Sequence, residues 1–394
     1  MNVEQLRAQT PGCAHHAHLN NAGAGLMSQP VLDVIHGHLE LEAQVGGYEA
    51  AEEREGAIAD AYRAVGELVG APPRQIAFTE NATASFVQAL SSIRFEHGDV
   101  LLTTRNDYVS NQIQLLSLQQ HLGVRVVRIP DLPEGGVDPD AARALIAAER
   151  PRLVCVTHVP TSSGLVQDVC AVGAACRDHD VTYLVDACQS VGQLPLDIEE
   201  IGADFLSATA RKYLRGPRGS GFLAVSERVL EAQLMPLFPD LRSANWVSED
   251  SFQPVDGARR FENWEFAWSL VLGTGAAARY ALDLGVAEID QRVRALAARL
   301  RAGLEEMEGA SVLDRGADLC GIVTTWIEGN DPRELELRLR DEGIHTSSQG
   351  RDNAVLDYDS KGVSGALRLS PHAYNTEEEI DRALAALASI SALS

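Results

Sequence analysis

Several features that would assign a protein to a common functional class are missing from this 394-residue chain. No stretch approaches the length and apolar character of a transmembrane helix, so no membrane partner is expected. The net charge is −23 and no basic stripe offsets it, so a nucleic-acid partner is not expected either. The first six residues carry neither a basic region nor an apolar core, so we expect no secretory signal and a cytoplasmic location.

The cysteines and histidines also lack the spacings of a structural site. Six cysteines are present without a C-x-x-C pair, and most of them lie in apolar or helical patterns, which favours reduced thiols in the core. His15, His16 and His18 are clustered, but no carboxylates or cysteines at ligand spacing accompany them. A polar entry segment is therefore expected there, and no metal site.

What is present is the composition of a large globular protein. Hydrophobic residues make up 45% and charged residues 23%, both ordinary for soluble proteins. Because single cores rarely grow beyond about 250–300 residues, we expect two domains.

One lysine marks the candidate site. Within residues 203–225 two short apolar runs enclose hydroxyls, arginines, glycines and Lys212. A loop lysine is usually solvated, but apolar neighbours that desolvate this amine and the adjacent Arg211 both predict a lowered pKa. A neutral amine can form a Schiff base with a carbonyl cofactor.

An aspartate upstream strengthens this interpretation. Residues 181–185 form a continuous apolar run typical of a buried parallel strand, and Asp186 ends it. Carboxyl ends of such strands are where open α/β sheets build sites. Pyridoxal phosphate requires a carboxylate that keeps its pyridine nitrogen protonated, and Asp186 would supply it.

The segments 185–190, 207–213 and 216–221 resemble the cofactor core of class V aminotransferase-like, fold-type I pyridoxal-phosphate enzymes. The resemblance extends over nearly the whole chain. Segments 240–246 and 260–265 are similar to the isopenicillin epimerase-like branch, which includes C–S lyases of ergothioneine and lincosamide biosynthesis.

This resemblance implies an α/β fold, with a large domain built on a mostly parallel seven-stranded sheet and a smaller α+β C-terminal domain. We expect an N-terminal segment at 1–19, the large domain at 20–255 and the small domain at 256–394. Patterning predicts helices over 270–284 and 286–307, broken at Gly285, and a capping box at Thr376–Glu379.

The cofactor phosphate is expected where a helix begins after the strand at 75–78. Free amide groups and the helix dipole favour an anion there, and the resemblance places it at Ala82 and Thr83. Capping of the helix by Thr79 or Asn81 is compatible with this. Thr209 and Arg211 are further candidates, and Arg215 or Arg218 could replace Arg211.

The rest of the cofactor is assigned by resemblance. Tyr108 is the candidate for stacking on the pyridine face and joins Lys212 and Asp186 as a catalytic residue. Thr161 stands where cysteine desulfurases usually have asparagine, so Gln189 could contact the phenolic oxygen instead.

Substrate contacts are expected from both ends of the chain. Arg368 resembles the arginine that binds the substrate α-carboxylate with a bidentate fork, although a strand arginine is usually a surface charge. Asn21, Ala22 and Gly23 lie in a glycine-rich turn that either borders the substrate or simply precedes a helix.

One departure bears on the reaction. Desulfurases of this superfamily hold a nucleophilic cysteine on a loop before the arginine, whereas residues 345–353 contain none. We therefore favour β-elimination from an S-substituted L-cysteine, releasing a thiol or sulfenate, pyruvate and ammonia. Epimerisation, decarboxylating oxidative deamination and a catalytically silent binding subunit are the alternatives.

The resemblance also implies a homodimer. The aromatic run Phe261–Trp268 is the candidate contribution to a partner's site. The alternative is a core segment within one chain.

Overall fold

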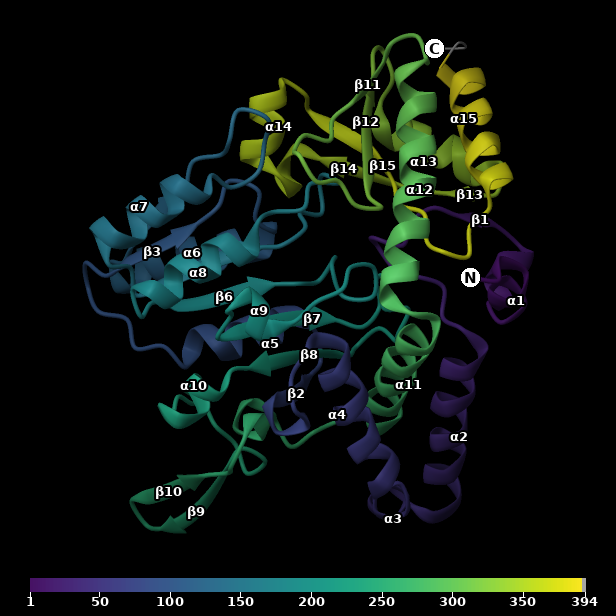
Figure 1. Ribbon diagram of the computed structural model, residues 1–394. Coiled ribbons are helices and arrows are strands. Elements are labelled where there is room, and N and C mark those ends of the chain that lie inside the picture. The colour runs from purple at the N-terminus through teal and green to yellow at the C-terminus, as the bar shows by residue number, and fades with distance from the viewer. Residues whose placement is uncertain (392–394) are drawn as a thin grey trace.

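A seven-stranded sheet forms the centre of the protein in the computed structural model, which describes residues 1–391 (Figure 1). Its order is β2-β8-β7-β6-β5-β3-β4, and only β8 runs against the others. The strands are β2 (Ile76–Thr79), β3 (Val100–Thr103), β4 (Arg125–Arg128), β5 (Leu153–Thr157), β6 (Thr182–Asp186), β7 (Phe205–Thr209) and β8 (Gly221–Val225). The mostly parallel seven-stranded sheet is thereby confirmed.

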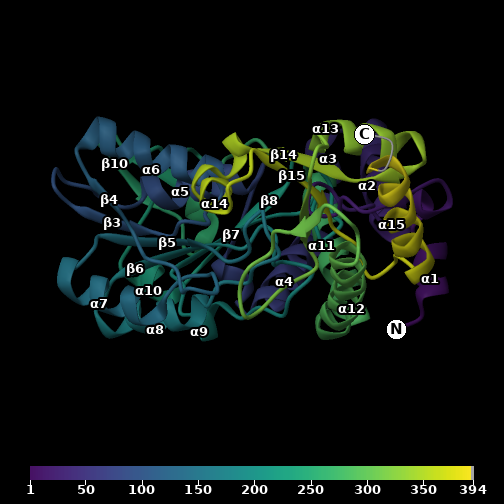
Figure 2. The same cartoon turned by 90° about the horizontal axis from the view of Figure 1, so that it is seen from above.

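Helices cover both faces of this sheet, which is why its inner strands are continuously apolar. One face carries α5 (Ala82–Ser91) and α6 (Val109–Leu122), as Figure 2 shows. The other carries α7 (Pro139–Glu149), α8 (Val169–Asp178) and α9 (Ile198–Ile201). Every residue of β5 is buried, and so is all of β6 except Thr182. Because β2, β3, β5, β6 and β7 point the same way, the loops after them meet at one edge.

A second sheet belongs to the C-terminal part of the chain. It is antiparallel in the order β11-β12-β15-β14, formed by β11 (Ala310–Val312), β12 (Val323–Ile327), β15 (Gly365–Leu369) and β14 (Ser347–Gly350). Three helices pack beside it: α12 (Val286–Glu305), α13 (Pro332–Asp341) and α15 (Glu377–Ser391). The capping box of α15 is confirmed, because Thr376 N donates to Glu379 Oε2 and Glu379 N donates to Thr376 Oγ1, both at 3.2 Å.

The N-terminal segment joins this second sheet region. β1 (Ala17–His18) pairs in parallel with β13 (Ile344–His345), and Arg7 forms an ion pair with Glu379. α1 (Val3–Ala8) contains Arg7. The first residues of the chain therefore bridge to its last helix.

Helix α11 (Trp268–Leu284) packs against α2 (Gln29–Val45) and α4 (Glu55–Val69), on the large-sheet side of the molecule. Gly285 follows it with a φ of 81°, and α12 then turns toward the second sheet. We therefore propose a domain boundary near residue 285 instead of the expected 255.

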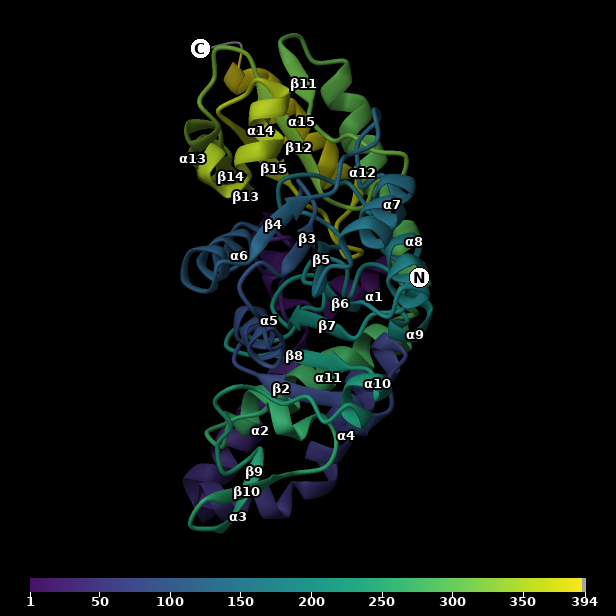
Figure 3. The same ribbon diagram turned by 90° about the vertical axis from the view of Figure 1, so that its left-hand side faces the viewer.

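Several elements have no counterpart in the sequence analysis. A hairpin of β9 (Ala244–Ser248) and β10 (Ser251–Pro254) projects from the end of the molecule opposite the second sheet (Figure 3). The remaining helices are α3 (Gly47–Glu53), α10 (Glu227–Glu231), α14 (Val355–Lys361) and the short turns η1 (Pro11–Ala14), η2 (Pro73–Gln75), η3 (Ala258–Phe261) and η4 (Arg351–Asn353). Within residues 1–391 no helix is long and apolar enough to cross a membrane.

Candidate active site

A cavity of about 370 Å³ opens at the carboxyl edge of the large sheet. It brings together seven of the predicted site residues from distant parts of the chain. The lining residues are Asn81, Ala82, Thr83, Tyr108, Asn111, Asp186, Cys188, Thr209, Arg211 and Lys212.

Lys212 lies just beyond β7 and is only 7% exposed. Burial lowers the pKa of its amine, and the charges of Arg211 and Arg368 lower it further, against Cys188 and Asp186, which raise it. The predicted direction of this pKa shift is confirmed, with burial as the main cause.

The chain contains only two lysines, so the sequence alone leaves two candidates for a Schiff-base lysine. The other, Lys361, has a buried side chain and forms an ion pair with Asp357 at 2.8 Å. Lys212 is therefore the one lysine in the described chain that lines this cavity.

Asp186 ends β6 with its carboxylate buried. Asn111 Nδ2 donates to Oδ2 at 2.8 Å, Cys188 N donates to Oδ1 at 2.9 Å, and Thr157 Oγ1 lies 3.5 Å from Oδ2. Asn111 was missed by the sequence analysis. It lies three residues after Tyr108 in the first turn of α6, a spacing that puts both side chains on the same side of the helix start.

Tyr108 is held by its backbone next to Lys212. Its N–H donates to Thr157 Oγ1 at 3.0 Å, and its ring centroid lies 5.7 Å from Lys212 Nζ. The preceding Asp107 is buried and accepts hydrogen bonds from Thr104 N at 3.1 Å and Thr157 N at 2.8 Å. These bonds fix the loop that presents the tyrosine.

The predicted anion site has the geometry of a capped helix start. Asn81 Oδ1 accepts from Ala84 N at 2.9 Å, while the first amide groups of α5, at Ala82 and Thr83, border the cavity. Gly221 of β8 lets the start of α5 pack close to the sheet, since a Cβ at this position would lie 2.9 Å from Ala82 N. Capping and anion binding are therefore compatible at this helix.

Of the three arginines considered for the phosphate, Arg211 lines the cavity. It donates to the carbonyl of Gly23, and burial lowers its pKa. Arg215 is buried elsewhere, with its guanidinium 4.9 Å from the Tyr374 ring centroid and its Nε bonded to Leu26 O at 2.8 Å. Arg218 is exposed.

Arg368 lies in β15 and is 3% exposed, and burial lowers its pKa to about 10. Its Nη1 donates to Thr161 Oγ1 at 2.7 Å, and its Nη2 donates to Asn20 Oδ1 at 3.2 Å. Its Nε has no hydrogen-bond partner within the described chain, which leaves a buried donor for a ligand. This arginine is a buried side chain held by neighbours, unlike a surface charge.

Gln189 connects the same residues to the N-terminal loop. Its Nε2 donates to Thr161 Oγ1 at 3.3 Å and to Ala22 O at 3.1 Å. Its Oε1 is buried without a hydrogen-bond partner among residues 1–391.

The loop at residues 20–23, where substrate contacts are predicted, is held by hydrogen bonds within the chain. The side-chain amide of Asn21 forms two hydrogen bonds within the chain. Its Nδ2 donates to Ser370 O at 2.8 Å, and its Oδ1 accepts from Tyr374 Oη at 2.5 Å. Ala22 N donates to Ser370 Oγ at 3.0 Å, and Gly23 O accepts from Arg211. These residues support the loop, and it is Asn20 whose side chain reaches Arg368.

Pyridoxal phosphate, the predicted cofactor, fits this arrangement. The buried amine, the buried carboxylate and the helix start match its aldehyde, its pyridine nitrogen and its phosphate. Two orphaned polar atoms, Gln189 Oε1 and Arg368 Nε, remain for the cofactor and its substrate.

Metal binding has no comparable arrangement in the described part of the chain, where no group of three or more metal-ligating side chains is found. His16 instead stacks on His345 with ring centroids 4.2 Å apart, and His18 Nδ1 lies 3.4 Å from His345 Nδ1.

The cysteines are unsuited to nucleophilic attack. Cys188 lines the cavity, but burial raises the pKa of its thiol, and burial raises that of Cys320 to about 12. Residues 347–350, without a cysteine, form strand β14, and Ser347 pairs with Arg368.

The aromatic run at 261–268 is only partly exposed. Phe261 is fully buried beside Phe205, with ring centroids 5.8 Å apart, so this residue belongs to the core of its own chain. The β9–β10 hairpin instead exposes Trp246 by 81% and Phe252 by 52%.

Comparison with known proteins agrees with this geometry. The family model described as Aminotransferase class-V matches residues 17–383. A probable cysteine desulfurase of Methanothermobacter thermautotrophicus is 29% identical, with 96% of each chain covered. A probable hercynylcysteine sulfoxide lyase of Mycobacterium tuberculosis is 30% identical, with 99% of this chain and 94% of the relative covered.

Solved structures share the fold. The apo cysteine desulfurase from Thermococcus onnurineus superposes with a TM-score of 0.92 at 24% identity, covering 100% of this chain and 99% of that one. The cystine C–S lyase C-DES, in complex with cysteine persulfide, gives 0.86 at 24% identity, covering 96% and 99%.

Proposed function

Because this chain belongs to the class-V aminotransferase family of pyridoxal-phosphate enzymes, we propose that it is a C–S lyase acting on an S-substituted L-cysteine. Elimination breaks the bond between Cβ and sulfur. The sulfur leaves as a thiol, or as a sulfenate from a sulfoxide, and hydrolysis of the remaining fragment yields pyruvate and ammonia.

The observation that carries this proposal is the identity of the residues beside Arg368. Desulfurases place their nucleophilic cysteine before this arginine, and here Ser347, Ser348 and Gln349 form a strand paired with β15. The cavity's one cysteine, Cys188, has a raised pKa that disfavours the thiolate. Elimination needs a base and a leaving group but no protein thiol.

Bound pyridoxal phosphate supplies an electron sink for the charge left at Cα. Lys212 is the base, since burial lowers the pKa of Nζ and favours the neutral amine that can accept the Cα proton. Asp186 would keep the proton on the pyridine nitrogen, and its carboxylate is held by Asn111 and by Cys188 N.

Binding and orientation are assigned to the remaining residues. Ala82, Thr83, Thr209 and Arg211 would hold the phosphate, and Tyr108 would lie against the ring. Arg368 binds the substrate carboxylate, with Thr161 and Asn20 holding its guanidinium in place. Gln189, beside Thr161, offers Oε1 as an acceptor for the cofactor or substrate.

A product analysis tests the reaction type. The holoenzyme is incubated with L-cysteine itself and with a panel of cysteine S-conjugates and their sulfoxides, and the products are measured by mass spectrometry. Thiol or sulfenate, pyruvate and ammonia in equal amounts would support elimination. Persulfide on a cysteine, inversion at Cα without thiol release, or carbon dioxide would instead identify a desulfurase, an epimerase or a decarboxylase. No turnover of any conjugate by cofactor-loaded protein would favour a silent subunit.

We further propose a cytoplasmic homodimer. The exposed aromatic side chains of the β9–β10 hairpin suit a protein contact better than solvent. All six cysteines are free, which fits a reducing compartment.

A further inference from the structure

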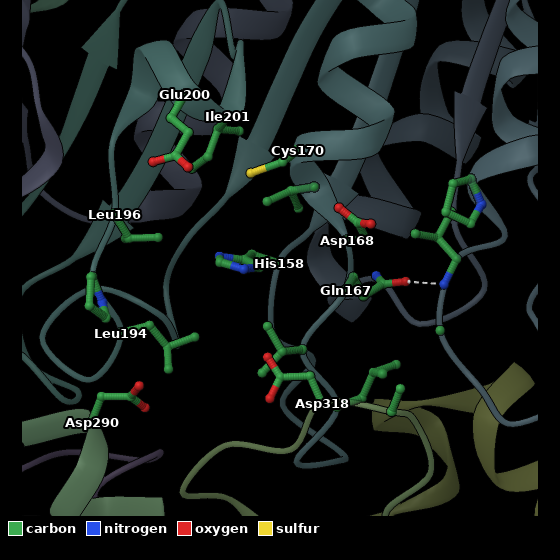
Figure 4. Close-up of a pocket in the computed structure, with 18 of the residues that line it drawn as sticks. His158, Gln167, Asp168, Cys170, Leu194, Leu196, Glu200, Ile201, Asp290 and Asp318 are labelled. Carbon is green, nitrogen blue, oxygen red and sulfur yellow. Dashed lines mark hydrogen bonds between the residues drawn. The ribbon is translucent and has the colours of Figure 1, made fainter. Parts of the chain in front are cut away.

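A second and larger cavity, of about 550 Å³, is shown in Figure 4. Its walls come from the start of α8, from residues 194–201 that lead into and include α9, and from α12 of the C-terminal part. It shares no lining residue with the first cavity.

Negative charge dominates the rim of this cavity. Asp168, Asp197 and Glu200 line it, and none of the three forms an ion pair within residues 1–391. The cation among the lining residues, Arg294, is neutralised by Asp290 at 2.6 Å and by Asp318.

The interior offers one polar group that has no role in the fold. His158 is 7% exposed, its ring lines the cavity, and its Nδ1 has no hydrogen-bond partner in the described chain. Figure 4 shows this ring in the middle of the view, among the labelled carboxylates. Burial lowers its pKa to about 4, so at neutral pH the imidazole is uncharged and retains an acceptor nitrogen.

Apolar side chains complete the surface. Val169, Leu194, Leu196 and Ile201 contribute hydrocarbon to its lining. An inorganic ion would leave this surface unused, whereas a ligand with an apolar body would cover it.

We propose that this cavity is a second binding site, for a small organic cation that carries a hydroxyl or N–H donor. The cationic nitrogen would lie among the rim carboxylates, where three negative charges without a cationic partner in the described chain favour it. The apolar body would cover the leucines, and the donor would give His158 the partner that it lacks. This site is independent of the reaction proposed for Lys212.

The test uses the cofactor-loaded enzyme and choline, a hydroxylated cation that cannot form a Schiff base with the cofactor. Its neutral isostere, 3,3-dimethylbutan-1-ol, serves as the uncharged comparison. Isothermal titration should show saturable binding of choline at one site per chain, at least tenfold tighter than binding of the alcohol. The absorption spectrum of the cofactor should not change.

Matched variants separate this site from the general negative charge of the protein. Asp168→Asn/Asp197→Asn removes two rim charges, yet asparagine caps α8 and α9 as well as aspartate does. This variant should bind choline at least tenfold more weakly. Asp99→Asn/Asp331→Asn removes the same charge at residues that also accept backbone hydrogen bonds outside the cavity, and it should bind like wild type.

Three results would overturn the proposal: no saturable binding, equal binding of choline and the alcohol, or equal weakening in both double variants. Each can occur whether or not the enzyme cleaves C–S bonds, so failure here is distinguishable from failure of the proposed reaction.

Discussion

Ser347 lies directly opposite Arg368 in the antiparallel pairing of β14 with β15. Directly opposed residues present their side chains on the same face of a sheet, so a hydroxyl accompanies the arginine on that face. Hydrogen bonds of a strand pair also hold this segment. A hydroxyl in place of a thiol cannot carry a persulfide, so the position is chemically unlike that of a desulfurase.

Lys212 should be the point of covalent attachment for the cofactor. Borohydride reduction followed by peptide mass spectrometry should place the cofactor mass on the peptide containing Lys212. Lys212→Ala should lose this label and lower kcat by about 1000-fold or more, because the base is removed. Lys361→Ala is the matched control and should keep the label; finding the mass on Lys361 would contradict the assignment.

Asp186→Asn should lower kcat by about 100-fold or more, since a neutral amide does not hold the pyridinium proton. The midpoint of urea unfolding should fall only modestly, because the asparagine oxygen still accepts one of the two hydrogen bonds and only the other is lost. Asn111→Ala should lower kcat by about tenfold, because a hydrogen bond to a charged group contributes about 1.5–3 kcal/mol. Steady-state kinetics with the best substrate check both variants, and near-normal turnover in Asp186→Asn would refute its role.

Arg368→Lys should raise KM by about 10- to 100-fold, because lysine lacks the bidentate fork. Asn20→Ala should have a smaller effect in the same direction, since Thr161 still holds the guanidinium. Arg351→Ala is the control, because this arginine pairs on the surface with Asp359. An unchanged KM in Arg368→Lys would move the carboxylate contact to another residue.

The hairpin should hold the dimer together. Trp246 and Phe252 are cross-strand partners, so Trp246→Ser/Phe252→Ser removes both aromatic faces without touching the core. Sedimentation velocity should show wild type at twice its 42.4 kDa chain mass and the variant as a monomer. Tyr48→Ser, at an exposed tyrosine of α3, should remain dimeric. A fully active wild-type monomer would remove the proposal.

His158 should make the protein less stable as the pH falls from about 6.5 to about 4. Its folded pKa lies below the ordinary value of 6.5, so the unfolded chain binds a proton in this window that the folded chain does not. Replacing it by glutamine should flatten the decline of the unfolding free energy, measured by urea titrations across this range. His36→Gln, at an exposed histidine of α2, should leave the slope as in wild type; an identical slope in His158→Gln would contradict the linkage.

Local signals in the sequence determined much of the large domain. The apolar runs that became β5 and β6, the caps of the helices and the capping box of α15 depend on neighbours within a few residues. Lys212, Asp186 and the start of α5 were recognisable for the same reason: Asp186 ends β6, α5 begins shortly after β2, and Lys212 lies three residues beyond the end of β7. Strand direction then brings their side chains to one edge.

Contacts between distant residues were decided only by the tertiary structure. The side chain of Asn20 forms a hydrogen bond with Arg368 across most of the chain, and Asn21 accepts one from Tyr374. Arg215 and Phe261 look like site and interface residues in sequence, yet packing buries them in the core. No local pattern reports which hydrogen-bond partner or apolar neighbour will be nearest once the sheets are packed, because that is a property of the assembled fold.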